Sequence, residues 1–351
     1  MRWLPDSVLW ISPLHRSTRK RVQDPHTQAG FRPGRVRVFP LLVALLGGCA
    51  SRPAVLTVPV SSWPGYEYLY LAEQQGLDGA QGFTLKTEEF ADPQGIVHAY
   101  LQGELAIAPL TTVEAVDICA RAPDRCPVVV LVLDESRGGD QLLARPGVTS
   151  ISQLRGRRVA VTQSTLGSYV LSRALEREGL SLRDVEVLHL PLAEIPAALA
   201  AGRVDAAALF PPYSEEARRQ AAAIRLFDSR EIPGEIFDIL VVDPKALERW
   251  GEVLPKLLRA WQAAHRLRRH QPDLAIPVVA SREGLSPQAF REVEKGLVYF
   301  DLPQQRPLLA PDGPVARNLR AVQQVQIQLD LIKPGSPLPA VNDVPLSKAA
   351  P

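Results

Sequence analysis

The sequence is poor in the residues from which metal centres and nucleophilic active sites are built. It contains 6 His, 3 Cys and a single Met in 351 residues. The His residues are scattered, and no HExxH pattern, clustered Cys/His spacing, Gly-x-Ser-x-Gly elbow or phosphate-binding loop occurs. The sequence therefore predicts a protein without a metal or cofactor and without enzymatic activity.

The chain also lacks a strong excess of charge of one sign. It has 40 Lys and Arg against 38 Asp and Glu, and much of the excess lies within the first 37 residues. The remainder is near neutral, so we expect no nucleic-acid partner. With 46% hydrophobic residues over this length, the chain can bury a sizeable core, and two compact lobes are expected.

The N-terminal region has no hydrophobic run long enough to cross a membrane. Val38 to Leu46 is apolar, follows Arg35 and Arg37, and ends in small residues, as the core of a cleaved export signal does. The run closes with Leu-Gly-Gly-Cys at Cys49, which resembles a bacterial lipobox and implies a diacylated Cys49 as membrane anchor. The alternative is a buried strand in which Cys49 is a small hydrophobic residue.

Residues 1–49 are accordingly interpreted as a leader. The first thirty residues do not fit a signal peptide, whose charged region is short and lies at its very start. We therefore hypothesise that translation begins near Val36 or Val38. The predicted location is the periplasmic side of a bacterial membrane or the cell surface, with the protein held by lipid at Cys49.

Two Cys residues remain beyond the predicted anchor. Cys119 and Cys126 flank a short segment between a predicted helix and a predicted strand. An even pair in an exported protein predicts a disulfide, and two free thiols are the alternative.

From residue 54 onward, short apolar runs alternate with helical patterns. This order predicts an α/β fold of parallel βαβ units in two lobes, each a mainly parallel sheet flanked by helices. The expected strands are 54–60, 83–88, 105–108, 128–133, 141–144, 158–161, 185–190, 206–210 and 236–242. The expected helices begin near Tyr66, Gln94 and Thr112 or span 150–154, 166–178, 193–201, 246–270, 287–295 and 314–331.

Two polar, Gly-containing stretches, 134–140 and 228–235, join strand-like runs. Glycine tolerates the backbone rotation that a hinge needs, so we expect the chain to cross between lobes twice. The first lobe would comprise 50–138 and 230–351, and the second 139–229. Ordinary surface loops are the alternative.

Several collinear motifs carry a family resemblance. The segment 58–73, "VPVSSWPGYEYLYLAE", is followed by "GELAIA" at 103–108, "SQLRGRRVAVTQ" at 152–163 and "GRVDA" at 202–206. Together they resemble the nitrate/sulfonate/taurine-type solute-binding proteins of ABC importers, relatives of the thiamine-pyrimidine-precursor binders. The resemblance implies the two-lobe type II periplasmic-binding-protein fold, a small-molecule solute and a membrane permease as partner. We expect the protein to be a monomer.

Ligands of open α/β sheets bind beyond the carboxyl ends of strands, where loops enter helices. We expect apolar walls and polar contacts from such loops and from the predicted hinges. Each side chain also has a structural alternative: Trp63 can fill the base of the first lobe, and Ser164 or Thr165 can cap a helix. The candidate ligand-binding residues are Ser62, Trp63, Tyr66, Glu67, Thr111, Thr112, Asp140, Ser164, Thr165, Ser168, Phe210, Tyr213 and Glu235.

Charge near the predicted cleft indicates the kind of solute. Acidic residues at Glu67, Asp134, Asp140, Asp228 and Glu235 outnumber the neighbouring cations Arg137 and Arg230. An amine or polar heterocycle therefore fits better than a bare dianion, although helix N-termini can receive a carboxylate or sulfonate. The main prediction is an importer's solute receptor. The alternatives are a ligand-sensing lipoprotein adaptor with the same fold and, less favoured, a pyrimidine-synthesising enzyme.

Overall fold

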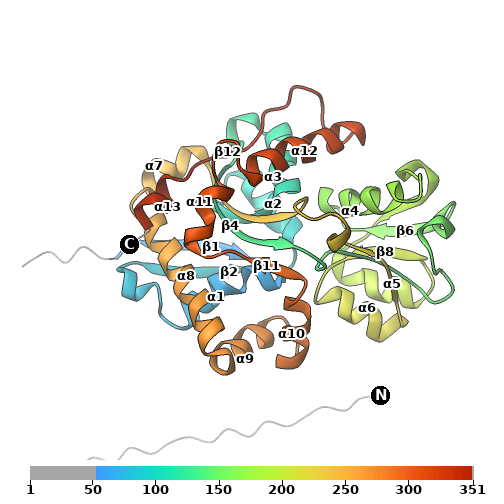
Figure 1. Ribbon diagram of the computed structural model, residues 1–351, viewed down its shortest axis with the longest axis horizontal. Coiled ribbons are helices and arrows are strands. Elements are labelled where there is room, and N and C mark those ends of the chain that lie inside the picture. Colours follow the sequence, from blue (N-terminus) through green and yellow to red (C-terminus); the bar gives the residue numbers. More distant parts are fainter. Residues whose placement is uncertain (1–52, 350–351) are drawn as a thin grey trace, which may run out of the picture. The chain divides into compact units, whose positions relative to one another are not determined.

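The strands of the chain form separate sheets, one group built from both chain ends and one from the middle of the sequence (Figure 1). The computed structural model describes residues 53–349, which belong to one compact unit. Cys49, Val36, Val38 and the rest of the predicted leader lie outside these residues.

In the first lobe, a two-stranded parallel sheet lies beside a sheet in the order β11-β4-β10-β3, with β12 paired to β4. The central strand β4 is buried along its whole length, as its uninterrupted Val/Leu run predicts. The strands are β1 (Val55–Val60), β2 (Thr84–Glu89), β3 (Ile107–Thr111), β4 (Val128–Ser136), β10 (Phe237–Val242), β11 (Leu297–Tyr299) and β12 (Ala340–Val341).

Helices from both ends of the chain flank these sheets. Most are amphipathic, and their apolar faces enter one continuous core. They are α1 (Glu67–Gln74), α2 (Pro93–Gln102), α3 (Thr112–Arg121), α7 (Leu247–Trp250), α8 (Leu254–His270), α9 (Pro272–Arg282), α10 (Pro287–Glu294), α11 (Leu302–Leu308), α12 (Pro314–Gln328) and α13 (Val344–Ala349).

The second lobe is a five-stranded sheet in the order β7-β6-β8-β5-β9, with α4, α5 and α6 grouped around it in Figure 1. Its strands are β5 (Gln141–Ala144), β6 (Arg158–Val161), β7 (Glu186–His189), β8 (Ala206–Leu209) and β9 (Ile224–Asp228), and its helices are α4 (Thr165–Glu176), α5 (Ile195–Ala200) and α6 (Tyr213–Ala221).

The α/β class and the flanking of sheets by helices are confirmed, but the sheets are mixed rather than mainly parallel. Parallel pairs occur within the βαβ units, as in β1–β2 and β6–β7. The strands next to the crossings, β5 and β10, pair antiparallel with their neighbours. These strands enter their sheets through an extended connection without a crossover helix, so the parallel rule does not apply to them.

Some predicted helices differ from those observed. The stretch 150–154 is a single 3₁₀ turn, and 246–270 is divided into α7 and α8. Pro255 lies in the first turn of α8, where its missing N–H costs nothing, and this position marks a helix start rather than a helix interior. Helix α9 was not expected, and it contains Pro277 within its span.

The chain passes between the lobes at the two predicted stretches, from β4 to β5 and from β9 to β10. The two connections bind each other: the Ser136 and Ser229 hydroxyls lie 2.9 Å apart, and the Gly138 N–H donates to Ser229 Oγ at 2.6 Å. Gly138 has φ of 119°, a conformation that favours glycine. The exact lobe boundaries at 139 and 229 stay a prediction.

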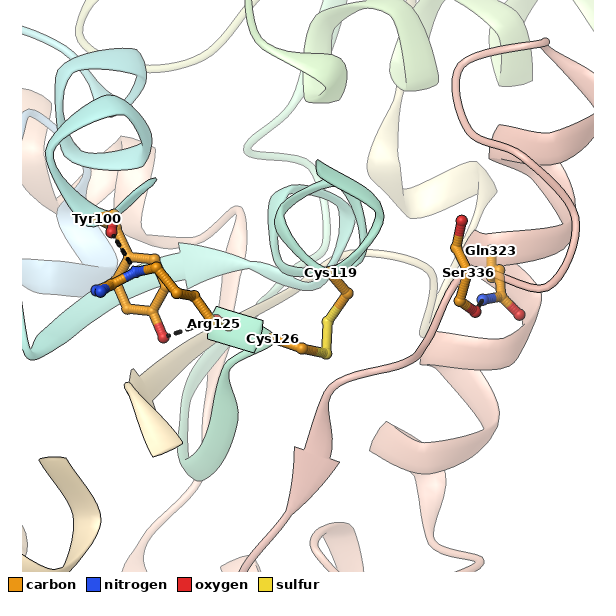
Figure 2. The surroundings of a disulfide bond; sticks show 6 residues. All are labelled: Tyr100, Cys119, Arg125, Cys126, Gln323 and Ser336. Atoms are coloured by element: carbon orange, nitrogen blue, oxygen red, sulfur yellow. Dashed lines mark hydrogen bonds between the residues drawn. A yellow bond between two sulfur atoms is a disulfide. The ribbon is translucent and has the colours of Figure 1, made fainter. Parts of the chain in front are cut away.

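Cys119 and Cys126 form a disulfide, drawn in Figure 2. It joins the last turn of α3 to the segment that leads into β4, with Cα atoms 4.1 Å apart. Arg125 holds the same connection, because its Nε donates to the Tyr100 carbonyl at 3.1 Å (Figure 2). The C-terminal end of α3 is therefore fixed to the start of a central strand.

Among residues 53–349, no helix combines the length and the apolar character that crossing a bilayer requires.

Candidate functional site

Residues of both lobes line a small cavity, here called the acidic cavity, of about 20 Å³. The first lobe contributes most of the wall. Leu166 of α4 and Phe210, which follows β8, come from the second lobe, and Asp140 lies on the connection into it, inside that lobe's predicted bounds of 139–229. The lining residues are Trp63, Tyr66, Pro93, Thr111, Glu114, Asp140, Leu166, Phe210 and Asp238.

Helix α3 brings Glu114 to the acidic cavity. Thr111 is its N-cap: Thr111 Oγ accepts from the Glu114 N–H at 3.1 Å, and Glu114 Oε2 accepts from the Thr111 N–H at 3.0 Å. This reciprocal capping box holds one carboxylate oxygen of Glu114. Its other oxygen, Oε1, is buried and has no hydrogen-bond partner within residues 53–349.

Asp134 and Asp238 lie opposite each other on the neighbouring strands β4 and β10. The Trp63 indole N–H donates to Asp134 Oδ2 at 3.2 Å, and the Tyr66 hydroxyl donates to Asp238 Oδ1 at 2.8 Å. Gly65 permits this approach, because a Cβ there would overlap Asp134 Oδ2. Asp134 Oδ1 and Asp238 Oδ2 are left without a hydrogen-bond partner among the described residues.

Burial and like charge determine the protonation of these carboxyl groups. Burial raises the pKa of Asp134 and of Asp238 well above the ordinary range, and the two lie directly opposite each other. Two carboxylates in such a position cannot both ionise easily, so protonation of one member of the pair is favoured. Burial also raises the pKa of Glu114 to about 7 and that of Asp140 to about 6.

Asp140 lies on the first connection between the lobes. Its backbone N–H donates to Ser136 Oγ at 3.1 Å, and Ser136 in turn contacts Ser229 on the second connection. The Asp140 side chain lines the acidic cavity. A cavity residue is thus part of the hydrogen-bonded pair of connections about which the lobes would rotate.

Aromatic side chains of the two lobes meet at the acidic cavity. Trp63, from the loop after β1, and Phe210, from the loop after β8, make an edge-to-face contact with centroids 5.7 Å apart. Tyr213, at the start of α6, contacts Phe210 in the same manner at 6.1 Å. These contacts join the lobes through apolar surface directly beside the carboxyl groups.

A second cavity, here called the side cavity, adjoins the first and shares Pro93, Glu114, Leu166 and Phe210 with it. It encloses about 220 Å³. Its remaining lining is mostly apolar or uncharged, from the starts of α2 and α4 and the loop after β7: Asp92, Gln94, Thr162, Gln163, Ser164, Leu190, Pro191 and Leu192.

The structure brings together some of the residues that the sequence proposed. Trp63, Tyr66, Thr111, Asp140 and Phe210 line the acidic cavity, and Ser164 lines the side cavity. The other seven candidate residues lie within the described part of the chain but line neither cavity: Ser62, Glu67, Thr112, Thr165, Ser168, Tyr213 and Glu235.

Ion pairs explain why Glu67 and Glu235 line neither cavity. Arg282 contacts the fully buried Glu67 carboxylate, and Arg282 also reaches Glu89 at 2.7 Å. Glu235 accepts from Arg173 Nε at 2.8 Å and from the Tyr169 hydroxyl at 2.9 Å. Both carboxylates are thus engaged by cations that sequence spacing does not reveal, since their partners are distant along the chain.

Sequence reasoning missed Glu114 and Asp238 as site residues, and both had a signal. The Thr111-x-x-Glu114 pattern before an apolar helix is a capping-box pattern that places a Glu at a helix N-terminus. Asp238 is the one charged residue of the apolar strand Phe237–Val242, and a buried charge is informative in such a run.

No Lys, Arg or His is among the described residues that line the two cavities. Within residues 53–349, no three or more His, Cys, Asp or Glu side chains are grouped so that they could hold a metal ion. The site therefore offers buried carboxyl groups and aromatic faces, but no basic side chain, to whatever it binds.

The protein family described as NMT1/THI5 like matches residues 63–275 of the chain. A protein of Escherichia coli (strain K12) that is named as an aliphatic sulfonates-binding protein is 29% identical over 138 residues. That match covers 39% of this chain and 43% of the relative, so the chain spans less than half the length of this curated relative.

Solved structures share the fold. The alkanesulfonate-binding protein SsuA from Xanthomonas axonopodis pv. citri, bound to MOPS, has a TM-score of 0.70 and 21% identity, covering 84% of this chain and 100% of that one. The desulfurization enzyme DSZB has a TM-score of 0.58 and 19% identity over 85% of this chain and 96% of its own. The predicted two-lobe fold is confirmed, and this fold alone does not separate binding from catalysis.

The raised pKa of Glu114 predicts a pH-dependent stability that a single substitution removes. A carboxyl group with a folded-state pKa above its unfolded value stabilises the protein at low pH, and this contribution is lost as pH rises through the folded pKa of about 7. Glu114→Gln keeps an acceptor for Thr111 but cannot ionise. As the pH rises from about 5 to about 8, the unfolding free energy of the variant should increase, relative to that of the wild type, by roughly 1–3 kcal/mol.

Urea unfolding of both proteins across this pH range measures the difference. Comparing the two proteins cancels other titrations, including that of His265, whose pKa burial lowers to about 4 and whose effect has the opposite sign. A difference between the two proteins that does not change with pH would contradict the assignment.

Proposed function

The chain belongs to the NMT1/THI5-like family, and we propose that it is the solute-binding component of an ABC importer, without catalytic activity. The observation that carries the proposal is the acidic cavity, whose wall comes from both lobes: Trp63 and Tyr66 on one side, Leu166 and Phe210 on the other. A solute bound there touches both lobes at once. We take the solute to be a small organic molecule of the nitrate/sulfonate/taurine or pyrimidine-like class.

Binding then drives closure. A ligand that contacts both lobes has more favourable interactions in the closed state than in an open one, so it shifts the population toward closure. The two connections at Ser136 and Ser229 are the hinge, with lobe 1 formed by 50–138 and 230–351 and lobe 2 by 139–229. The closed form, a monomer, is the species that the permease would recognise.

Phe210→Ala tests whether this cavity is the binding site. The substitution removes the larger of the two apolar side chains that the second lobe contributes to the wall, and burying a Phe side chain is worth about 1.5–3 kcal/mol, so affinity should fall at least about tenfold. Phe300→Ala is the matched control, because Phe300 packs on Phe237 and does not line either cavity.

The measurement is equilibrium dialysis of each protein against a mixture of nitrate, alkanesulfonates, taurine, amines and aminopyrimidines, read by mass spectrometry. The wild type and Phe300→Ala should both retain one class of solute in a saturable way, and Phe210→Ala should lose it. If no solute is retained, or if Phe210→Ala retains it as well as the wild type, the proposed site is wrong.

We further propose that the mature protein is attached to the outer face of a bacterial membrane by acyl chains on Cys49. The support is the lipobox-like sequence, since two acyl chains suffice for stable attachment. Cys49→Ser should move the protein from the membrane fraction to the soluble fraction of its cells, as detected by immunoblot. Retention of Cys49→Ser in the membrane fraction would exclude this anchor.

A further inference from the structure

The acidic cavity has an unusual balance of charge for a site in a protein that resembles anion binders. Three carboxyl groups line it, from Glu114, Asp140 and Asp238, and Asp134 lies opposite Asp238 on the neighbouring strand. Within the described residues, no basic side chain lines this cavity or the side cavity. Burying carboxylates without a cation is costly, so the site is poised to receive positive charge.

Two of these side chains have free acceptors. Glu114 and Asp238 are each 2% exposed, and Glu114 Oε1 and Asp238 Oδ2 have no hydrogen-bond partner in the part of the chain that the structure covers. A buried acceptor without a donor costs on the order of 1–3 kcal/mol. A ligand with several N–H donors would supply what the protein does not.

The aromatic walls favour the same kind of ligand. Trp63, Tyr66 and Phe210 surround the carboxyl groups, and the faces of such rings attract cations. Trp63 and Tyr66 already donate their polar hydrogens to Asp134 and Asp238. Their rings therefore remain as apolar surface for a ligand to contact.

We infer that the solute is an organic cation, whose protonated nitrogen donates hydrogen bonds to the carboxylates of Glu114, Asp140 and Asp238. This inference rests on the proposed function as a solute receptor and, among the solutes named there, selects an amine-bearing or protonated heterocyclic one over nitrate or an alkanesulfonate. An ammonium group has three N–H donors and no acceptor, which matches three carboxyl groups. The uncharged body of the ligand extends past Leu166 and Phe210 into the side cavity, which these residues share.

The same geometry opposes a ligand whose only charge is a sulfonate. Such an anion would lie among carboxylates with no cation beside it, and like charges at close range repel. We therefore do not expect this chain to bind a sulfonate, although similar proteins are named for sulfonate binding.

The test uses three probes with one apolar body and different charge. Benzylamine is a cation, benzyl alcohol is neutral and phenylmethanesulfonate is an anion. The affinity of each probe for the purified full chain is measured by titration calorimetry at neutral pH. Benzylamine should bind at least about tenfold more tightly than benzyl alcohol, a factor that corresponds to ~1.4 kcal/mol, and phenylmethanesulfonate should bind least.

Two neutralising variants and one matched control locate the effect. Glu114→Gln and Asp140→Asn should each weaken benzylamine binding about tenfold and leave benzyl alcohol binding little changed. Asp205→Asn is the control: Asp205 is buried in the second lobe and pairs with Arg145 at 2.7 Å, but it lines neither cavity. It should leave the amine affinity unchanged.

A pH series adds an independent readout. Benzylamine affinity should rise from about pH 5.5 to about pH 7.5 as the cavity carboxyls ionise, because benzylamine itself stays charged over this range. The ionisable groups that face Glu114 and Asp140 are the acids of the site and its neighbours: Tyr66, Asp117, Asp134 and Asp238.

The outcomes separate this inference from the proposed function. Tighter binding of phenylmethanesulfonate than of benzylamine, or amine binding that Glu114→Gln and Asp140→Asn do not weaken, overturns the cation while leaving a solute receptor. Failure of all three probes, together with retention of an anion or a neutral solute in the dialysis, also overturns it. Failure of the dialysis with every class of solute overturns the proposed function itself.

Discussion

The burial of carboxyl groups without basic partners is the constraint on which the rest of the site depends. Asp134, Asp238 and Glu114 are almost fully buried at the junction of the lobes. They are tolerated because burial raises their pKa values, so that protons partly neutralise them, and because Trp63, Tyr66 and Thr111 donate hydrogen bonds to them. Neighbouring features serve this arrangement: Gly65 leaves room for Asp134, and the disulfide fixes the far end of the helix that begins beside Glu114.

Under the proposed mechanism, this constraint would couple binding to the relative movement of the lobes. Glu114, Asp134 and Asp238 belong to the first lobe and Asp140 to the connection into the second, whereas Leu166 and Phe210 cover them from the second. If the lobes were apart, the acids could be hydrated and ionised. On closure they would have to take up protons or meet a cation, because the low-dielectric interior disfavours unpaired charge. A cationic solute would thus make closure favourable at a pH where the unliganded protein resists it.

The fold was predictable from the sequence where local pattern decides the structure. The short, mostly apolar runs within β1, β4, β6 and β10 indicated their strands to within a few residues, because strands that are largely buried carry few polar residues. Strand β9 and helix α6 were not foreseen. Helix α6 is rich in Glu and Arg, and Ile224 at the start of β9 is exposed, so neither carries a strong periodic signal.

The site was predictable only in part, because it depends on pairs that are distant along the chain. The loops after strands included Trp63, Thr111 and Phe210, and the predicted hinge included Asp140; all four line the acidic cavity. The pairing of Asp134 with Asp238 follows from the antiparallel register of β4 and β10, which no spacing in the sequence encodes. For the same reason, the ion pairs of Glu67 with Arg282 and of Glu235 with Arg173 were not predicted.

The most direct test of this account is whether buried carboxyl groups hold protons at neutral pH. Infrared spectroscopy distinguishes the C=O stretch of a protonated carboxyl group from the bands of a carboxylate, and Asp238→Asn removes one member of the central pair while leaving an acceptor for Tyr66. The account predicts a protonated-carboxyl band in the wild type at pH 7 that weakens in Asp238→Asn. A wild-type spectrum without such a band would show that these acids are fully ionised and would contradict the account.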